Sequence, residues 1–232
     1  MRVGIIGAMA IEVELLKQQM QEARIQEISG ITFYIGILEG IEVSVAVAGV
    51  GKVNAAICAQ TMILRFQPDV VINVGVAGGL DETLHVGDIV IADSVVQHDM
   101  DTTPFGDPAG YIPGLERVKI VCTDWVVKKM ERAADKLDDI QIKTGVIATG
   151  DQFISTKEKK GWIRETFSAL AAEMEGASIG QVCEINRTEF CVVRAISDGA
   201  DDGAPMSFEQ FTELAAHHSL QLILNFLREV EA

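Results

Sequence analysis

Carboxylates stand at the ends of several apolar, strand-like runs of this chain. They are Glu12 with Glu14, the two glutamates of Glu173-Met174-Glu175, and Asp198. In open α/β sheets, ligands bind at the carboxyl ends of the strands, so acidic side chains at these positions indicate a functional site. Taken singly, Glu12 and Glu14 also suit the dipole at the start of a helix, and Asp198 suits an ordinary turn. The residues alone leave both interpretations open.

Glycine-containing turns end several strand-like runs. They read Gly4-Ile5-Ile6-Gly7-Ala8-Met9, Ala48-Gly49-Val50-Gly51-Lys52 and Gly75-Val76-Ala77-Gly78-Gly79. Glycines there let the backbone approach a ligand closely, although each turn alone fits a tight strand-to-helix connection equally well. None has the pattern GxxxxGK(S/T) or GxGxxG, so a P-loop nucleotidase or a nicotinamide dehydrogenase has little support.

The set of motifs closely resembles the bacterial 5'-methylthioadenosine/S-adenosylhomocysteine nucleosidases of the nucleoside phosphorylase superfamily. The motifs stand in the same order as in that family and cover nearly the whole chain. They are GIIGAM followed by Glu12, AGVGKVNAA, NVGVAGGL, GDQFI, AAEMEGA and VVRAISDGAD. The resemblance implies hydrolysis of the N-glycosidic bond of 5'-methylthioadenosine and S-adenosylhomocysteine, and also of 5'-deoxyadenosine. The products would be adenine and a thioribose product, which places the reaction in methionine salvage and methyl-cycle recycling.

The resemblance also gives the charged residues distinct roles. Asp198 matches the general acid that protonates adenine N7, and Glu12 matches the group that orients and deprotonates the attacking water. Glu175 matches the carboxylate that accepts hydrogen bonds from the ribose 2'- and 3'-hydroxyls. Glu173 matches a further acidic position, and Arg194 matches the arginine that helps to hold the water and the carboxylates. Cleavage leaves positive charge on the sugar and negative charge on the base, so these roles suit the chemistry.

The walls of the expected site follow from the same resemblance. Phe153 and Ile154 match the segment that stacks on adenine and reads its edge, and Met174 would line the sugar face. Met9 and Phe208 would form the apolar wall for the 5' substituent, with core packing as the alternative for both. The remaining expected pocket residues are Val76, Gly78 and Ser197.

Two positions depart from the family pattern. Val76 stands where relatives often carry Ser or Thr, and Ala48 stands where Ser is common, which affects the placement of water and the ranking of substrates. A phosphorylase would cleave the same bond with phosphate, which demands several cations or a dense set of backbone donors. Near the strand ends the cations are Arg194 and Lys52, and Glu12 would repel phosphate, so water is the expected nucleophile. A nucleoside phosphorylase, a futalosine-type hydrolase and a catalytically silent nucleoside-binding module remain alternatives.

The composition restricts the partners. A formal charge of −15 argues against nucleic acid and anionic membranes, which bind clustered Lys and Arg, although solubility alone also explains the charge. A small adenine nucleoside is the expected partner. The N-terminus lacks the features of a signal peptide, and four scattered cysteines are typical of reduced thiols, so a cytoplasmic location is expected. The histidines form no convincing metal site, and the expected reaction requires no cofactor.

Strand-like runs alternate with helical periodicity, which predicts one α/β domain over residues 1–232. The resemblance implies a three-layer αβα fold with a central mixed, partly barrel-like sheet. We expect strands at 3–6, 32–38, 43–47, 70–74, 88–95, 142–148 and 189–196. We expect helices at 11–23, 52–66, 123–137, 157–165, 177–185 and 207–230, the last beginning with a capping box of Ser207 and Gln210.

Two connections refine this fold. Glu39-Gly40 joins two adjacent strands as an antiparallel hairpin, so a pure Rossmann order is not expected. The segment 97–115 is rich in Pro and Gly, and loops of this length in compact domains are usually functional or part of an interface. In the resembling family such a loop crosses a two-fold interface, which implies a homodimer in which Phe105 and Pro113 cap the 5' pocket of the partner.

Overall fold

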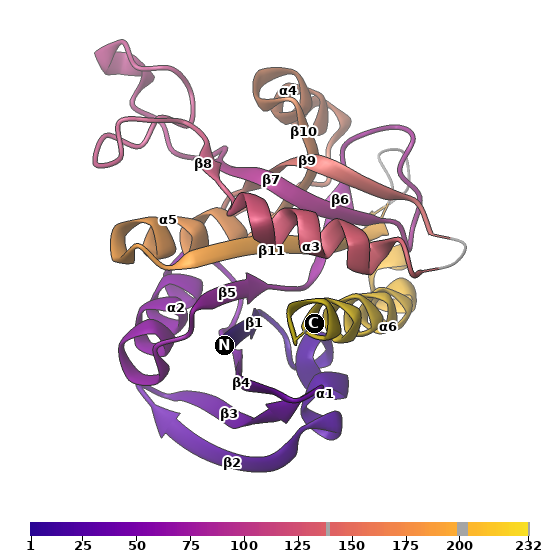
Figure 1. Ribbon diagram of the computed structural model, residues 1–232. Helices are drawn as coiled ribbons and strands as arrows, with labels where there is room; N and C mark the ends of the chain where they lie inside the picture. The colour runs from indigo at the N-terminus through magenta and orange to yellow at the C-terminus, as the bar shows by residue number, and fades with distance from the viewer. Residues whose placement is uncertain (138–139, 199–203, 232) are drawn as a thin grey trace.

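A computed structural model describes residues 1–137, 140–198 and 204–231, the last range without the side chains of residues 204–215. Within these ranges, eleven strands form one sheet in the order β2-β3-β4-β1-β5-β11-β6-β10-β9-β7-β8 (Figure 1). The strands are β1 (Arg2–Gly7), β2 (Gln21–Ile28), β3 (Ile31–Leu38), β4 (Ile41–Val47), β5 (Val70–Asn73), β6 (Val76–Gly79), β7 (Ile89–Gln97), β8 (Ile120–Val121), β9 (Ile142–Thr149), β10 (Ala169–Glu173) and β11 (Glu189–Asp198).

Part of the sheet closes into a five-stranded barrel. Strand β7 pairs with both β9 and β11, β11 pairs with β6, β6 with β10, and β10 with β9, which completes the ring. The ring contains both parallel and antiparallel strand pairs, so the prediction of a mixed, partly barrel-like sheet is confirmed. The first half of β11 pairs with β5 in the open part, and its second half belongs to the barrel. Strand β11 therefore links the two parts and ends at the barrel with Asp198.

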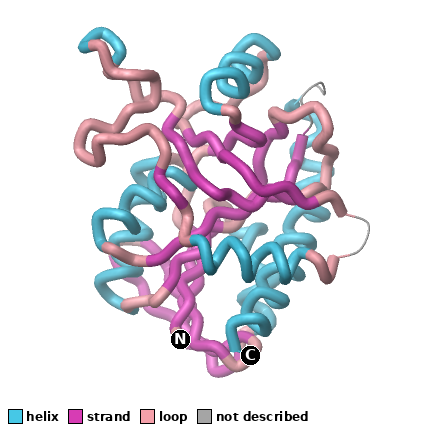
Figure 2. Tube along the Cα trace, turned by 45° about the horizontal axis from the view of Figure 1, so that its top comes forward, coloured by secondary structure: helices cyan, strands magenta, loops and turns pink. Residues whose placement is uncertain are grey.

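Helices cover the sheet on both sides. They are α1 (Ala10–Gln19), α2 (Lys52–Phe66), α3 (Asp124–Ala134), α4 (Lys157–Phe167), α5 (Gly176–Asn186) and α6 (Ala204–Glu231). Helix α6 packs against α1 and α3, whereas α2 packs against α5 on the other side (Figures 1 and 2). The middle layer consists of strands such as β1, β5 and β11, whose runs of Val and Ile are almost fully buried. This is the predicted three-layer arrangement. Among the described residues, no helix is long and apolar enough to cross a membrane.

Several predicted elements are confirmed. The helix at 52–66 has the predicted bounds, because Gly51 and Gln67 adopt left-handed backbone conformations with φ of 97° and 48° on either side of it. The hairpin is also confirmed, since β3 and β4 pair antiparallel through the turn at Glu39 and Gly40. Helix α6 begins at Ala204. The predicted capping box of Ser207 and Gln210 cannot be compared, because these two side chains lie outside the described ones.

The predicted helix at 11–23 is wrong at its end. It stops at Gln19, and the chain continues directly into β2, an edge strand that pairs antiparallel with β3. Nearly every residue of β2 is exposed. Its sequence QEARIQEI therefore lacks the alternation of apolar and polar residues by which a half-buried strand is predicted. Strands β6, β8 and β10 were also not expected, because they are short or consist largely of Gly and Ala.

The segment between β7 and β8 has little regular structure. It contains one short 3-10 helix, Thr103–Phe105, and it extends away from the body of the molecule (Figures 1 and 2). Phe105 at its end has 88% of its surface exposed, and Pro113 is exposed as well.

Candidate active site

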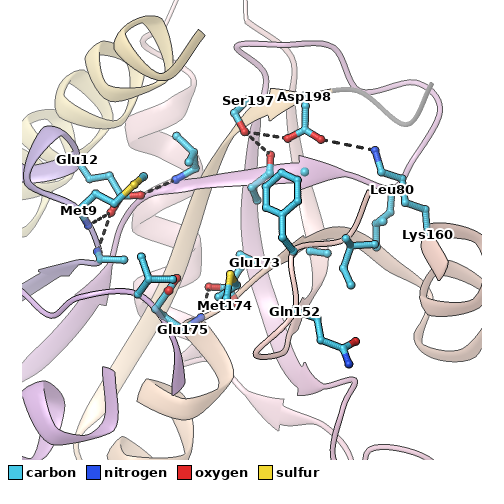
Figure 3. Close-up of a pocket in the computed structure, with 18 residues that line it drawn as sticks. Met9, Glu12, Leu80, Gln152, Lys160, Glu173, Met174, Glu175, Ser197 and Asp198 are labelled. Carbon is cyan, nitrogen blue, oxygen red and sulfur yellow. Dashed lines mark hydrogen bonds and ion pairs between the residues drawn. The ribbon is translucent and has the colours of Figure 1, made fainter. Parts of the chain in front are cut away.

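A cavity of about 270 Å³ lies where β1, β6, β10 and β11 end (Figure 3). Most of the residues expected from the sequence line it: Met9, Glu12, Val76, Gly78, Phe153, Ile154, Glu173, Met174, Glu175, Ser197 and Asp198. Arg194 is not in the lining and lies behind the carboxylates, with 1% of its surface exposed. Phe105 and Pro113 do not line this cavity, and the side chain of Phe208 lies outside the described ones.

Glu12 is held at one end of the cavity by the turn between β1 and α1. One carboxylate oxygen accepts hydrogen bonds from the backbone N–H groups of Ala8 (2.7 Å) and Met9 (2.8 Å), and the other accepts from Val76 (3.1 Å). A Cβ atom on Gly75 would lie 2.5 Å from Oε1 of Glu12, so glycine is required there. Burial raises the pKa of Glu12, and the charge of Arg194 and the three backbone donors oppose that rise.

Arg194 joins the carboxylates behind the cavity. Its Nη2 donates hydrogen bonds to Asn73 Oδ1 (2.6 Å) and to Glu173, and lies 3.6 Å from Glu175 Oε2. Glu173 also accepts a hydrogen bond from the hydroxyl of Thr149. Because these contacts occupy both oxygens of Glu173, its side chain is fixed and it acts here as a positioning residue.

Glu175 stands between β10 and α5, with its carboxylate directed to the same end of the cavity as Glu12. Its Oε1 accepts a hydrogen bond from the backbone N–H of Gly51 at 2.9 Å. Burial, and then the neighbouring Glu173 carboxylate, raise the pKa of Glu175 to about 7, although Arg194 opposes the shift. An ionised Glu175 therefore costs the folded protein free energy at neutral pH.

This shift predicts a pH-dependent change in stability for Glu175→Gln. The pKa of Glu175 is raised from 4.5 to about 7 on folding, so the folded state binds the proton more tightly. The free energy of unfolding therefore falls as the pH rises between these values. Relative to the wild type, the variant should be more stable at pH ~8 than at pH ~5, by about 1–3 kcal/mol. Urea unfolding at the two pH values measures this, and an equal difference at both would contradict the assignment.

Asp198 occupies the other end of the cavity, at the end of β11. Its Oδ1 accepts a hydrogen bond from the hydroxyl of Ser197 (3.0 Å), and its Oδ2 lies 3.6 Å from the ammonium of Lys160. A Cβ atom on Gly78 would lie 3.2 Å from the same Oδ2, so a larger residue there would press on the carboxylate. Asp198 is 2% exposed.

Lys160 is a cavity residue that the sequence did not reveal. It lies in Lys157-Glu158-Lys159-Lys160, a run of charges that is typical of the solvated face of a helix. The sequence does contain one signal of its burial, which is its spacing from Ile163. The two residues are about one helical turn apart, so they share a face of α4, and both are buried. Gln152, Leu80 and Val50 also line the cavity without having been expected.

The cavity thus has two chemically different ends. Glu12 and Glu175 lie at one end, and Asp198 and Lys160 lie at the other (Figure 3). Such an arrangement can protonate one part of a ligand while it stabilises positive charge on another part. Among the described residues, no group of three or more His, Cys, Asp or Glu side chains could hold a metal ion.

The barrel-containing sheet and the carboxylates of this cavity belong to a known class. Residues 2–228 match the phosphorylase superfamily. Over its whole length the chain is 44% identical to the 5'-methylthioadenosine/S-adenosylhomocysteine nucleosidase of Bacillus pumilus, which it covers completely. The chain therefore belongs to the phosphorylase superfamily and, within it, to the family of 5'-methylthioadenosine/S-adenosylhomocysteine nucleosidases.

Solved structures agree with this membership. The Neisseria meningitidis nucleosidase in complex with methylthio-immucillin-A superposes with a TM-score of 0.94 at 36% identity, covering 98% of both chains. The Colwellia psychrerythraea nucleosidase in complex with adenine also has a TM-score of 0.94, at 41% identity, covering 99% of this chain and 95% of that one. The fold around the cavity is thus shared with nucleosidases solved in complex with methylthio-immucillin-A and with adenine.

Proposed function

We propose that the chain hydrolyses the N-glycosidic bond of 5'-methylthioadenosine and S-adenosylhomocysteine, with 5'-deoxyadenosine as a further substrate. The two thio-substituted nucleosides give adenine and a thioribose product, consistent with methionine salvage, and 5'-deoxyadenosine gives adenine and 5-deoxyribose. The observation that carries the proposal is the two-ended cavity, with a buried carboxyl group at one end and two more at the other. The relatives named above support the choice of substrate.

Asp198 acts at the base. The bond between C1' and N9 breaks, its electron pair moves to the purine, and Asp198 gives its proton to N7. Asp198 must therefore carry a proton when the nucleoside binds. Ser197 fixes the orientation of the carboxyl group through its hydrogen bond to Oδ1.

Glu175 and Met174 act at the sugar. The two oxygens of Glu175 suit the vicinal ribose hydroxyls, because a carboxylate accepts more than the one hydrogen bond that Gly51 donates. The negative charge of Glu175 lies close to the positive charge that develops on the ring, and stabilises it.

Glu12 activates the water. Its three backbone contacts hold the carboxylate still, and the remaining lone pairs can accept a proton from water as the water oxygen bonds to C1'. The raised pKa of Glu12 makes it a stronger base than an exposed glutamate. Val76 contributes its backbone N–H to this site, and the missing side-chain hydroxyl does not remove that contact.

Water is a better nucleophile here than phosphate. The buried Arg194 is already engaged by Glu173 and Glu175, and Glu12 adds a further negative charge. A phosphate dianion would meet repulsion at this end of the cavity, which disfavours the phosphorylase alternative.

Adenine release from 5'-methylthioadenosine tests the proposal. Release at the same rate with and without phosphate supports hydrolysis, whereas a strict need for phosphate supports a phosphorylase. Release of the purine base from a futalosine, without release of adenine from 5'-methylthioadenosine, would support the other hydrolase. No release from either compound would support a binding module and contradict the proposal.

We further propose one domain over residues 1–232, located in the cytoplasm and assembled as a homodimer. All four cysteines are free and buried, as in proteins of a reducing compartment.

The surface that supports the homodimer is apolar. Exposed apolar side chains lie along α2 and beside it on α5: Val53 (69%), Ile57 (45%), Leu64 (65%) and Ile185 (63%). Val50, just before α2, is 49% exposed and lines the cavity, so this apolar surface reaches the cavity mouth. A second copy bound there would lie beside the part of the cavity that holds the 5' substituent of the nucleoside. It would contribute its Phe105 to that part.

Ile57→Asp should break this dimer. A charge placed in a contact of apolar side chains lacks a partner, so the equilibrium should move to the monomer, and the KM for 5'-methylthioadenosine should rise about tenfold or more. Sedimentation velocity and kinetics check both effects. Ile25→Asp, an equally apolar and 64% exposed position on β2, is the matched control. A wild-type protein that is monomeric and fully active would contradict the dimer.

A further inference from the structure

Among the described residues that line the cavity, Lys160 is the only cation. Its side chain is 6% exposed, and its ammonium lies 3.6 Å from Oδ2 of Asp198, whose side chain is 3% exposed. Leu80 and Ile154 line the same cavity. An ammonium group removed from water costs free energy unless polar groups compensate it. The adenine chemistry above gives Lys160 no role, although it lies beside the group that acts on the base.

Purines differ at the edge that faces Asp198. Adenine offers N7 as an acceptor and its 6-amino group as a donor, whereas a 6-oxopurine offers two acceptors, N7 and O6. A protonated carboxyl group has one donor and one acceptor, so alone it matches adenine. Beside a 6-oxopurine, its acceptor oxygen would face O6 and repel it.

The ammonium of Lys160 can remove this repulsion. Lysine has three N–H donors, so the group that lies near Asp198 Oδ2 can also donate to an oxygen bound next to it. A 6-oxopurine that leaves with the electron pair of the glycosidic bond places part of its negative charge on O6. A buried cation there stabilises the leaving base more than an exposed one would.

We propose that Lys160 determines base specificity, and that it extends the substrate range to 5'-substituted nucleosides of a 6-oxopurine. This inference rests on the proposed hydrolase function. The bond between C1' and N9 breaks, Asp198 gives its proton to N7, and Lys160 keeps its protons while it donates a hydrogen bond to O6. Water bonds to C1' and passes its proton to Glu12, so the products are the free 6-oxopurine and the ribose that carries the 5' substituent.

Hydrolysis of 5'-methylthioinosine and 5'-methylthioadenosine by the same preparations tests the inference. The wild type should release hypoxanthine from the first and adenine from the second. In Lys160→Met, kcat/KM for the inosine compound should fall about 10–100-fold further than kcat/KM for the adenosine compound, as expected for a lost charged hydrogen bond. The matched control is Lys159→Met, which removes the same charge from the neighbouring position, where the ammonium lies 4.1 Å from the centre of the Trp162 ring.

Base binding gives a second measurement that does not depend on turnover. Calorimetry with free hypoxanthine and adenine should give dissociation constants within about tenfold of each other for the wild type, and a selective loss of hypoxanthine binding in Lys160→Met. If the variant does not fold, the wild-type comparison alone decides.

The possible failures are distinguishable. If the wild type cleaves 5'-methylthioadenosine but neither cleaves the inosine compound nor binds hypoxanthine, the inference is wrong and the proposed function stands. An equal loss for both substrates in Lys160→Met would show that the lysine only stabilises the site. If neither nucleoside is cleaved, the proposed function fails, and the inference fails with it.

Discussion

Replacing Asp198 by Asn should lower kcat for 5'-methylthioadenosine by about 10²–10⁴-fold, the usual contribution of a general acid. The Asn amide has the same shape, with an NH2 group as donor and a carbonyl oxygen as acceptor, so it can still bind the N7 and 6-amino edge of adenine. It cannot transfer a proton to N7, and the base would have to leave as an anion. The loss should therefore appear in kcat, with a much smaller change in the dissociation constant of the nucleoside.

Single-turnover kinetics and equilibrium binding to the inactive variant measure these two quantities separately. Asp124→Asn is a suitable control, because this carboxylate is exposed on α3 and pairs with Lys128. A variant Asp198→Asn that keeps more than about a tenth of the wild-type kcat would show that another group protonates the base. Loss of binding with unchanged kcat would instead make Asp198 a recognition residue.

Glu12→Gln should reduce kcat by a similar factor, about 10²–10⁴-fold, for a different reason. A glutamine does not take a proton from water. Its NH2 group also takes the place of one carboxylate oxygen, and in the wild type these oxygens accept hydrogen bonds from Ala8, Met9 and Val76. At least one buried N–H group then loses its acceptor, which should cost about 1–3 kcal/mol of stability.

Glu14→Gln is the natural control for this change. Glu14 lies two residues further along the same helix, has 45% of its side-chain surface exposed and forms an ion pair with Lys17. Its replacement should leave turnover within about twofold, because surface ion pairs contribute little. If both glutamine variants retained full turnover, water activation would have to be assigned to a different residue.

The contrast between Glu12 and Glu14 shows what the sequence can decide. Both residues fit the first turn of a helix, and only the resemblance to a family separated them. In the structure, Glu12 is buried and reaches back to the turn after β1 and across to β6. Such a contact joins residues 64 positions apart, and local periodicity contains no information about it.

The barrel illustrates a second limit. The hairpin of β3 and β4 and the helix α2 follow from local signals, namely alternating residues and glycine turns. Closure of the barrel depends on β6 and β10, whose sequences VAGG and ALAAE lack the β-branched residues that predict strands. These two strands form because their neighbours in the barrel pair with them, and single-sequence patterns do not report such pairing.

Lys160 shows the same limit at the site. Its position in a run of charges predicts exposure, and only the packing of α4 against the barrel buries it next to Asp198. The carboxylates, in contrast, follow apolar strands whose ends meet at one edge of the sheet, so their proximity could be anticipated.

In the proposed reaction, water cleaves the nucleoside in this cavity. Identifying the sugar product by mass spectrometry, after turnover of 5'-methylthioadenosine in excess phosphate, tests it most directly. We expect free 5-methylthioribose together with an equal amount of adenine. Accumulation of 5-methylthioribose 1-phosphate would contradict the account.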